Sequence, residues 1–305
     1  MQMLISILYD CLYHSAPIIL CVLGGIFAYK ANVLNIALEG MMLNGAFIAV
    51  LSYYATKNMA ITLLLTIGST LLYGLIFSYF GITLKGNVIV IGLALNMAAS
   101  AIAGFVLVMM HSSNIIIPDF SVNEFKINIP LIKDIPIIGS IVSGHPAITY
   151  LSFLMIFLIY ILMYHTKFGV YVRVVGETEE AAKTIGIRTN LYKYAAVLLG
   201  AVGCALAGMN LSLERMGLFT NNMTAGRGFI AIAAIYCGQG DPVRSSLYAI
   251  LFGLARSLSV NLSIYAGNAA GLFDCIPYIV MVGVLSFASF VKHKNVRERG
   301  FKVNE

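Results

Sequence analysis

The segment at residues 31–51, ANVLNIALEGMMLNGAFIAVL, places polar side chains at the start of an otherwise apolar stretch. They are the amides of Asn32, Asn35 and Asn44 and the carboxylate of Glu39. Inside a membrane such groups are costly unless they face protein, water or a passing solute. We therefore expect a transport protein, with these groups as the first candidates for its pathway.

Asn35 and Glu39 are four residues apart, so on a helix they would share one face. From that face they could line a polar passage, or they could cap a helix break by hydrogen bonding to freed backbone groups. A second polar site contains Arg227, between two glycines in TAGRGF. An arginine at membrane depth needs carbonyls, a carboxylate or solvent, and Glu214 is a candidate partner.

Small residues recur every four positions in two other apolar stretches. This spacing lets neighbouring helices approach closely, and an amide among the small residues can hydrogen-bond across the contact. We expect packing to dominate at both places, while Arg256 beside the second series could extend toward the outer surface. The series are Gly92, Asn96, Ser100 and Gly104, and Ala249, Gly253, Ser257 and Asn261.

The composition indicates the class of protein that presents these groups. Of the 305 residues, 60% are hydrophobic and 10% are charged, against roughly 25% charged in soluble domains. So much apolar surface predicts an all-α, polytopic membrane protein. The net charge of +6 falls in loops, which indicates topology rather than a nucleic-acid partner. The cysteines and histidines show no metal-ligand spacing, so no metal site is expected.

Apolar stretches near the length that crosses a bilayer follow one another along the chain, and they predict about 8–10 spans. Nine can be delimited, of which 228–237 is too short for an ordinary span unless it recruits the polar residues before it. The nine are 4–29, 37–55, 60–82, 88–110, 147–164, 192–211, 228–237, 243–262 and 275–290.

Lysine and arginine set the expected orientation. The loop 165–193 and the tail after Phe290 each carry five of them, which places both in the cytoplasm. Counting spans backwards then puts the N-terminus and the loop 111–146 outside. No linker separates soluble parts, so residues 1–305 are predicted to form one multi-pass membrane domain in the cell membrane.

Two polar, glycine-containing blocks suggest an internal repeat. NVLNIALEGMMLNGAF at 32–47 and LFTNNMTAGRGFIAIA at 218–233 each precede or begin a short apolar helix. The span count gives them opposite directions, as in inverted repeats whose interrupted helices meet at a binding site. Coincidence between glycine-rich apolar sequences is the alternative.

The cytoplasmic loop contains GETEEAAKTIGI. Thr178 or Glu179 can open a short helix there, alanines keep its surface low, and Gly186 can end it. Such a helix could dock in a groove of a partner protein and transmit a rigid-body push. A solvated acidic turn is the alternative.

Three blocks, ANVLNIALEGMM, GETEEAAKTIG and FTNNMTAGRGFIA, resemble the permease subunits of ABC importers for branched-chain amino acids, simple sugars and nucleosides. The nucleoside and simple-sugar branch is the most similar. The resemblance implies an ATPase-coupling role for Glu180, Ala181, Ala182 and Gly186. The pathway candidates are Asn35, Glu39, Asn44, Asn96, Asn221, Asn222, Thr224 and Arg227.

The same resemblance implies partners: ATP-binding cassette ATPases, a second homologous permease and an extracytoplasmic binding protein or lipoprotein. ATP and magnesium would bind the ATPase, since GITLKGNV at 81–88 lacks the P-loop lysine and no catalytic cluster is evident. This chain is thus expected to bind no cofactor and to be no enzyme. An ion-coupled secondary transporter of small polar solutes is the alternative, although it would not explain the EAA loop.

Overall fold

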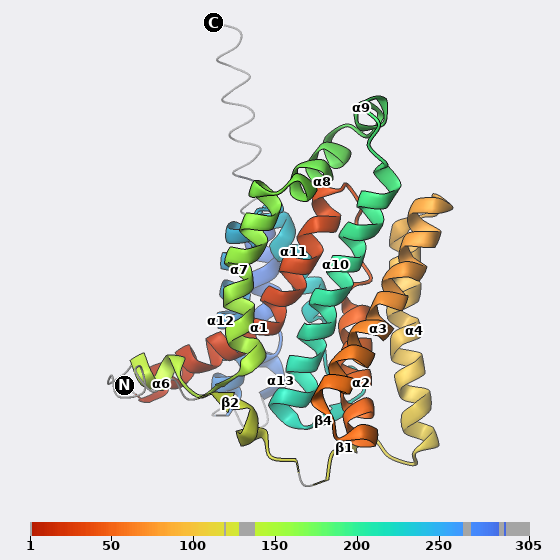
Figure 1. Ribbon diagram of the computed structural model, residues 1–305. Helices are drawn as coiled ribbons and strands as arrows, with labels where there is room; N and C mark the ends of the chain where they lie inside the picture. Colours follow the sequence, from red (N-terminus) through yellow and green to blue (C-terminus); the bar gives the residue numbers. More distant parts are fainter. Residues whose placement is uncertain (1, 119, 128–137, 265–269, 287–289, 291–305) are drawn as a thin grey trace, which may run out of the picture.

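The computed structural model describes residues 2–118, 120–127, 138–264, 270–286 and 290. Over these ranges the chain is a helical bundle (Figure 1). Two π-helical segments, η1 (Tyr79–Thr83) and η3 (Asn210–Glu214), extend the third and tenth helices. The α-helices are α1 (Gln2–Lys30), α2 (Leu38–Thr56), α3 (Met59–Ser78), α4 (Val88–Met109), α6 (Ile138–Val142), α7 (Ala147–His165), α8 (Lys167–Glu177), α9 (Glu179–Thr184), α10 (Thr189–Met209), α11 (Arg227–Cys237), α12 (Pro242–Ser263) and α13 (Ala270–Phe273).

Each of the nine predicted stretches coincides with a helix, the last one as far as residue 286 in the described part. Within the described residues, five helices are long and apolar enough to cross a membrane: α1, α3 with η1, α4, α7, and α10 with η3. Glu39 and Asn44 reduce the apolar character of α2, and α11 has only 11 residues. The expected all-α polytopic architecture is confirmed.

Helices α1 and α10 form the centre of the bundle. Within their apolar windows 83% and 72% of residues are buried, against 17% in α4, whose outer face is therefore free for lipid or a partner. The two central helices cross at glycines: a Cβ added to Gly24 would lie 3.0 Å from the Cα of Gly200. Glycine at both positions allows this close approach.

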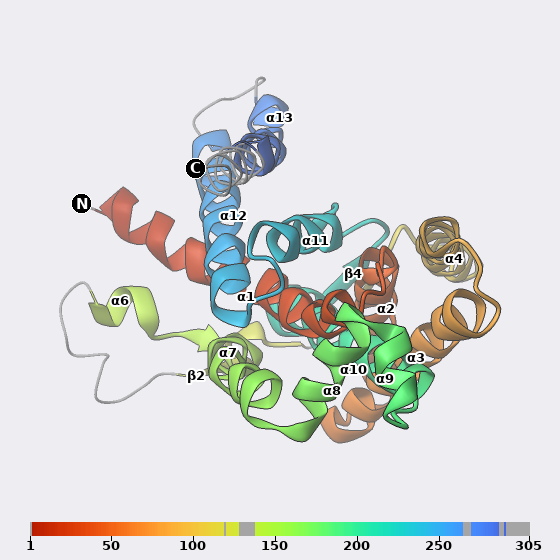
Figure 2. The same ribbon diagram turned by 90° about the horizontal axis from the view of Figure 1, so that it is seen from above.

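The surrounding helices divide between the two central helices (Figure 2). Helix α1 packs against α11 and α12, whereas α10 packs against α2 and α3. At its C-terminal end α11 reaches the end of α1, where the rings of Tyr236 and Tyr29 are 5.1 Å apart. Helix α2 ends beside the segment that follows α4, where the rings of Tyr53 and Phe120 are 5.5 Å apart. The two helices therefore run in opposite directions, as the predicted inverted repeat requires.

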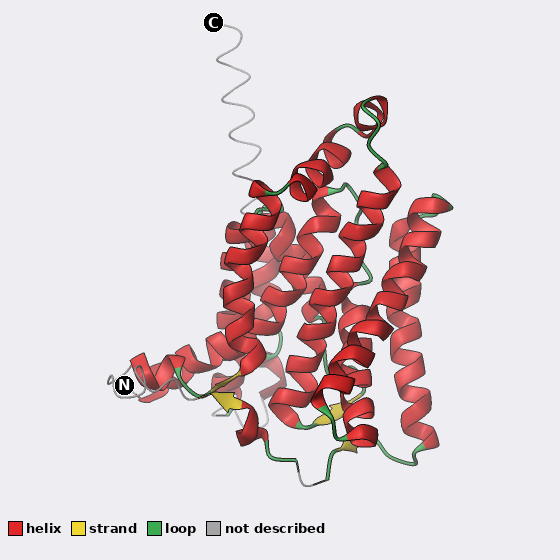
Figure 3. Ribbon diagram, in the orientation of Figure 1, coloured by secondary structure: helices red, strands yellow, loops and turns green. Residues whose placement is uncertain are grey.

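The two ends of the bundle differ in structure. Helices α8 and α9 lie at one end, and two small antiparallel sheets lie at the other (Figure 3). One sheet pairs β1 (Asn114–Ile116) with β4 (Leu218–Thr220), and the other pairs β2 (Lys126–Ile127) with β3 (His145–Pro146). The α8–α9 loop thus lies opposite the described parts of 111–146, as the basic residues predict. The basic tail lies outside the described residues.

Helix α1 bends on its way through the bundle, and its N-terminal part turns aside toward α6 (Figure 1). Pro17 lies inside the helix, where it removes one backbone hydrogen bond and kinks the axis. Beyond the bend, the ring of Tyr9 stacks on buried His145 at 4.1 Å. Burial lowers the pKa of His145, which favours the uncharged ring.

Candidate transport site at two helix starts

The carboxylate of Glu39 joins the start of α2 to the start of α11. Its Oε1 accepts a hydrogen bond from the Gly226 N–H at 2.9 Å, and its Oε2 accepts one from the Gly228 N–H at 2.6 Å. These amides belong to the first turn of α11, where backbone donors have no helical partner. The anion also complements the positive end of the α11 dipole. Glu39 of one helix therefore caps the other.

Two glycines make this contact sterically feasible. Gly226 has a φ of +74°, a conformation that strains other residues. At Gly228, a Cβ would lie 2.5 Å from both the Cα and the N of Glu39, so a side chain there would force the two helices apart. The glycines on either side of Arg227 are thus explained by the approach of α2.

The start of α2 is capped by amides. Asn35 accepts from the Ala37 N–H at 3.0 Å through its Oδ1, which closes an Asx turn. Asn96 of α4 accepts from the Gly40 N–H at 2.7 Å and donates to the Ile36 carbonyl at 3.0 Å. Of the two interpretations left open for Asn35 and Glu39, this geometry favours the cap.

Arg227 is buried but makes no ion pair with Glu39 or Glu214. Its Nη1 donates to the Met223 carbonyl at 2.9 Å and to the Thr224 carbonyl at 3.0 Å, which closes the turn before α11. The predicted partnership with Glu214 is wrong.

Glu214 instead serves the start of α7. It accepts from the Ile148 N–H at 3.3 Å and from the Asn210 amide at 2.9 Å. Sequence reasoning missed this cap, because the contact joins residues 66 positions apart. It also missed Arg215, whose guanidinium carbon lies 3.6 Å from the ring centre of Tyr13. The signal available was the pair of charges, Glu214–Arg215, in an apolar run.

Of the four remaining pathway candidates, two are buried and two are exposed. Asn44 is buried and donates to Ser69 at 3.1 Å between α2 and α3, and Thr224 is fully buried. Asn221 and Asn222 are exposed at the turn that precedes α11. Ser100 donates to the Asn221 Oδ1 at 3.3 Å.

Ser100 fixes the depth of this turn. It lies twelve residues into α4, about 18 Å along the helix from Val88. The exposed amides therefore lie near the middle of a membrane-length helix. Of the eight predicted pathway residues, Asn221 and Asn222 are exposed, while the other six mainly hold the helix starts and contacts together.

The predicted cytoplasmic helix is present as α9, with Thr178 before it. Gly186 follows it with a φ of +82°, as a residue that ends a helix does. Glu180 and Ala181 are exposed, whereas Ala182 is fully buried. Ile185, which sequence reasoning did not single out, is 70% exposed beside them.

Glu179 fixes α9 to α10. Its carboxylate pairs with Lys183 at 2.8 Å and with Lys193 of α10, and it accepts a hydrogen bond from Thr189 at 3.4 Å. The hydrogen bonds from the two lysines lower the pKa of Glu179 to about 2. The carboxylate is therefore ionised at neutral pH.

Comparison with known proteins covers most of the chain. The family model for the permease component of branched-chain amino acid transport systems matches residues 7–285. The nucleoside ABC transporter permease protein NupC of Lactococcus lactis subsp. cremoris is 33% identical over 289 residues, which covers 90% of this chain and 89% of NupC. The guanosine ABC transporter permease protein NupQ of Bacillus subtilis is 31% identical over 294 residues, covering 92% and 88%.

A third relative is the putative glucose ABC transporter permease protein TsgC13 of Haloferax volcanii, 28% identical over 299 residues, covering 92% of this chain and 90% of that protein. No solved structure matches the chain. The family match runs from within α1 through α12 and so includes both helix starts and α9. The chain is a multi-pass membrane protein that belongs to the family of permease components of branched-chain amino acid transport systems.

Proposed function

We propose that this chain is the membrane permease subunit of an ABC importer that moves a nucleoside or a simple sugar. The names of the three relatives support this class of solute. In this proposal an extracytoplasmic binding protein delivers the solute, a second permease subunit completes the pathway, and separate ATPase subunits bind ATP and magnesium. The C-terminus lies in the cytoplasm.

The observation that carries the proposal is the exposed turn at Asn221 and Asn222. Two amides at membrane depth are unfavourable against lipid and favourable against a solute with hydroxyl and ring-nitrogen groups. The turn joins directly to the α11 start that Glu39 caps. A movement of α2 relative to α11 would therefore change the position of these amides.

Helix α9 supplies the connection to the ATPases. Its exposed face, with Glu180, Ala181 and Ile185, can dock in an ATPase groove. Glu179 and Lys193 would then pass a push on α9 to α10, which packs against α1, α2 and α3. Closing of the ATPases would thus tilt the central helices and shift the pathway between outward and inward access.

The ion-coupled alternative is less well supported. Both oxygens of Glu39 accept backbone hydrogen bonds that fix the carboxylate to the start of α11, whereas a coupling carboxylate must exchange its partners as the ion binds and leaves. The Glu214 carboxylate likewise accepts hydrogen bonds from the Ile148 N–H and from the Asn210 side-chain amide.

The test is uptake of labelled nucleosides and sugars in a strain that lacks this chain. Deletion should abolish uptake of one class, and the wild-type chain should restore it. Asn222→Gly should lower uptake at least tenfold at unchanged membrane abundance, because it removes the exposed amide while glycine accepts the left-handed backbone of this position, φ 59°. The matched control is Gln239→Gly, which removes an exposed amide from another left-handed position, φ 54°. Undiminished uptake of every solute after deletion would contradict the proposal.

A further inference from the structure

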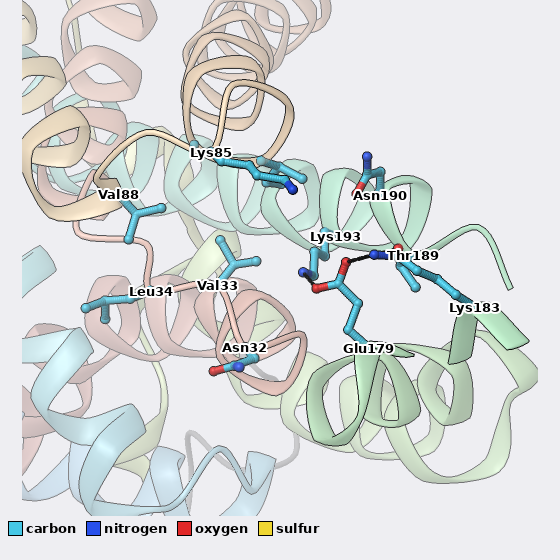
Figure 4. Close-up of a pocket in the computed structure, with 12 residues that line it drawn as sticks. Asn32, Val33, Leu34, Lys85, Val88, Glu179, Lys183, Thr189, Asn190 and Lys193 are labelled. Atoms are coloured by element: carbon cyan, nitrogen blue, oxygen red, sulfur yellow. Dashed lines mark hydrogen bonds and ion pairs between the residues drawn. The ribbon is translucent and has the colours of Figure 1, made fainter. Parts of the chain in front are cut away.

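A groove of about 480 Å³ lies at the end of the bundle that carries α8 and α9 (Figure 4). Four segments meet there: the α1–α2 loop, the turn between η1 and α4, the short helix α9 and the start of α10. These are the segments that the proposed push on α9 must set in relative motion. The pathway described above does not use the groove itself.

The groove is positively charged. Lys85, Lys183 and Lys193 line it together with one acid, Glu179, which leaves two positive charges in excess. Glu179 pairs with Lys183 and Lys193, whereas Lys85 forms no ion pair within the described residues. Figure 4 shows the Lys85 side chain extending across the groove toward α10, where Asn190 adds an uncharged polar group.

Neighbouring residues place the groove at the depth of lipid headgroups. Lys85 lies three residues before the membrane-length helix α4, and Lys193 lies in the first turns of α10. Beside them η1 exposes Tyr79 by 52% and Phe80 by 47%. Exposed aromatic side chains at the ends of membrane helices typically lie at the membrane–water interface.

We propose that this groove binds the phosphate group of an anionic phospholipid of the inner leaflet. Lys85 would be the main contact, because its ammonium is uncommitted. Lys183 and Lys193 would share the phosphate, since an ammonium has three donors and Glu179 occupies only part of that capacity. Basic pockets between helices on the cytoplasmic side suit such headgroups. The bound phosphate would tie the η1–α4 turn to α9 and α10, so lipid composition would bear on coupling.

The test measures lipid binding to the full-length chain assembled with its transporter partners and purified in detergent. Native mass spectrometry would compare phosphatidylglycerol with phosphatidylcholine of the same acyl chains. Wild-type protein should retain phosphatidylglycerol preferentially. Lys85→Gln should weaken that binding about fivefold, the effect of one lysine near a charged surface. Lys85→Arg, which keeps the charge, should bind as the wild type does.

The matched control is Lys57→Gln. Lys57 is also an exposed lysine with a left-handed backbone, φ 48° against 53° for Lys85, but it ends α2 on the opposite side. It should leave lipid binding unchanged. A phosphatidylglycerol preference that survives Lys85→Gln would overturn the proposal. Competition by inorganic phosphate, without any preference for phosphatidylglycerol, would overturn the lipid assignment and show that the groove takes a soluble phosphate.

Discussion

Two glutamates use their carboxylates in opposite ways in this molecule. Glu39, buried between α2 and α11, binds only backbone amides. Glu179, more than a third exposed beside α9, binds two lysine ammoniums. A backbone amide at a helix start cannot move without its helix, whereas a lysine side chain can leave and return. The first contact is suited to holding a fixed joint, and the second to a joint that is remade during each cycle.

The largest loss of folded protein is expected for Glu39→Gln. Glutamine can accept at one oxygen only, and its NH₂ group would face a backbone donor. We expect a loss of about 3 kcal/mol in stability, the cost of a charged hydrogen bond and an unsatisfied buried donor. Membrane abundance measured beside uptake would check this. Wild-type abundance with reduced uptake would mean that Glu39 acts in the pathway instead of holding the joint.

Gly228→Ala tests the same joint from the side of α11. The added methyl group would meet the backbone of Glu39, and such overpacking costs about 2 kcal/mol. The thermal midpoint of the detergent-solubilised chain should fall accordingly. Gly68→Ala is the control, because a Cβ on this helical glycine meets nothing within 4 Å. Equal midpoints for the two variants would refute the close contact.

Loss of the exposed contact between Glu179 and its two lysines should lower stability only slightly. Glu179→Gln removes two ion pairs, but solvent screens a side chain that is 36% exposed, so the cost stays below about 1 kcal/mol. The folded-state pKa is lowered, so the contribution is complete above the unfolded value of about 4.5 and is lost as the pH falls toward 2. The hydrogen-exchange protection factors of α9, which are corrected for the intrinsic pH dependence of exchange, should therefore change little between pH 5 and pH 8. Marked deprotection within that range would contradict the assignment.

Glu180→Lys should leave stability almost unchanged and yet abolish transport. The side chain is exposed, and reversing its charge alters only the surface proposed to dock on the ATPase. The assembled complex should form at normal abundance, with solute-stimulated ATP hydrolysis lost. Lys167→Glu, a reversal elsewhere in the same loop, provides the comparison. Normal stimulation in Glu180→Lys would remove α9 from the coupling role.

Local pattern was enough to predict the helices, the shortness of α11, and α9 from Thr178 to Gly186. Each depends on residues near one another in the chain, on apolar periodicity and on end signals. The opposite directions of the blocks at 32–47 and 218–233 could also be predicted from the sequence, since they require only a count of spans. Which residues touch could not be predicted, because packing between distant helices decides that. The choice of Glu214 as partner for Arg227 was wrong for this reason, since α7 lies closer to Glu214.

The exposure of the amides could not be predicted either. Asn96 lies inside an apolar stretch and the pair Asn221–Asn222 lies just before one, and the sequence does not show which of these amides is covered. In the folded chain α2 covers Asn96 with its own backbone, while no described segment covers Asn222. Burial of this kind depends on where a neighbouring helix begins, which is a property of the whole bundle.

The sheet formed by β1 and β4 connects the segment after α4 mechanically to the turn before α11. Asn114 pairs with Thr220, and Asn221 is the next residue along the chain. A strand resists stretching, so a pull on the outer segment at β1 travels along the ladder with little slack. It arrives at the turn that contains the exposed amides of Asn221 and Asn222. A protein that binds at this end of the bundle would therefore shift Asn221 through the sheet, and a shift of Asn221 would in turn act on that protein.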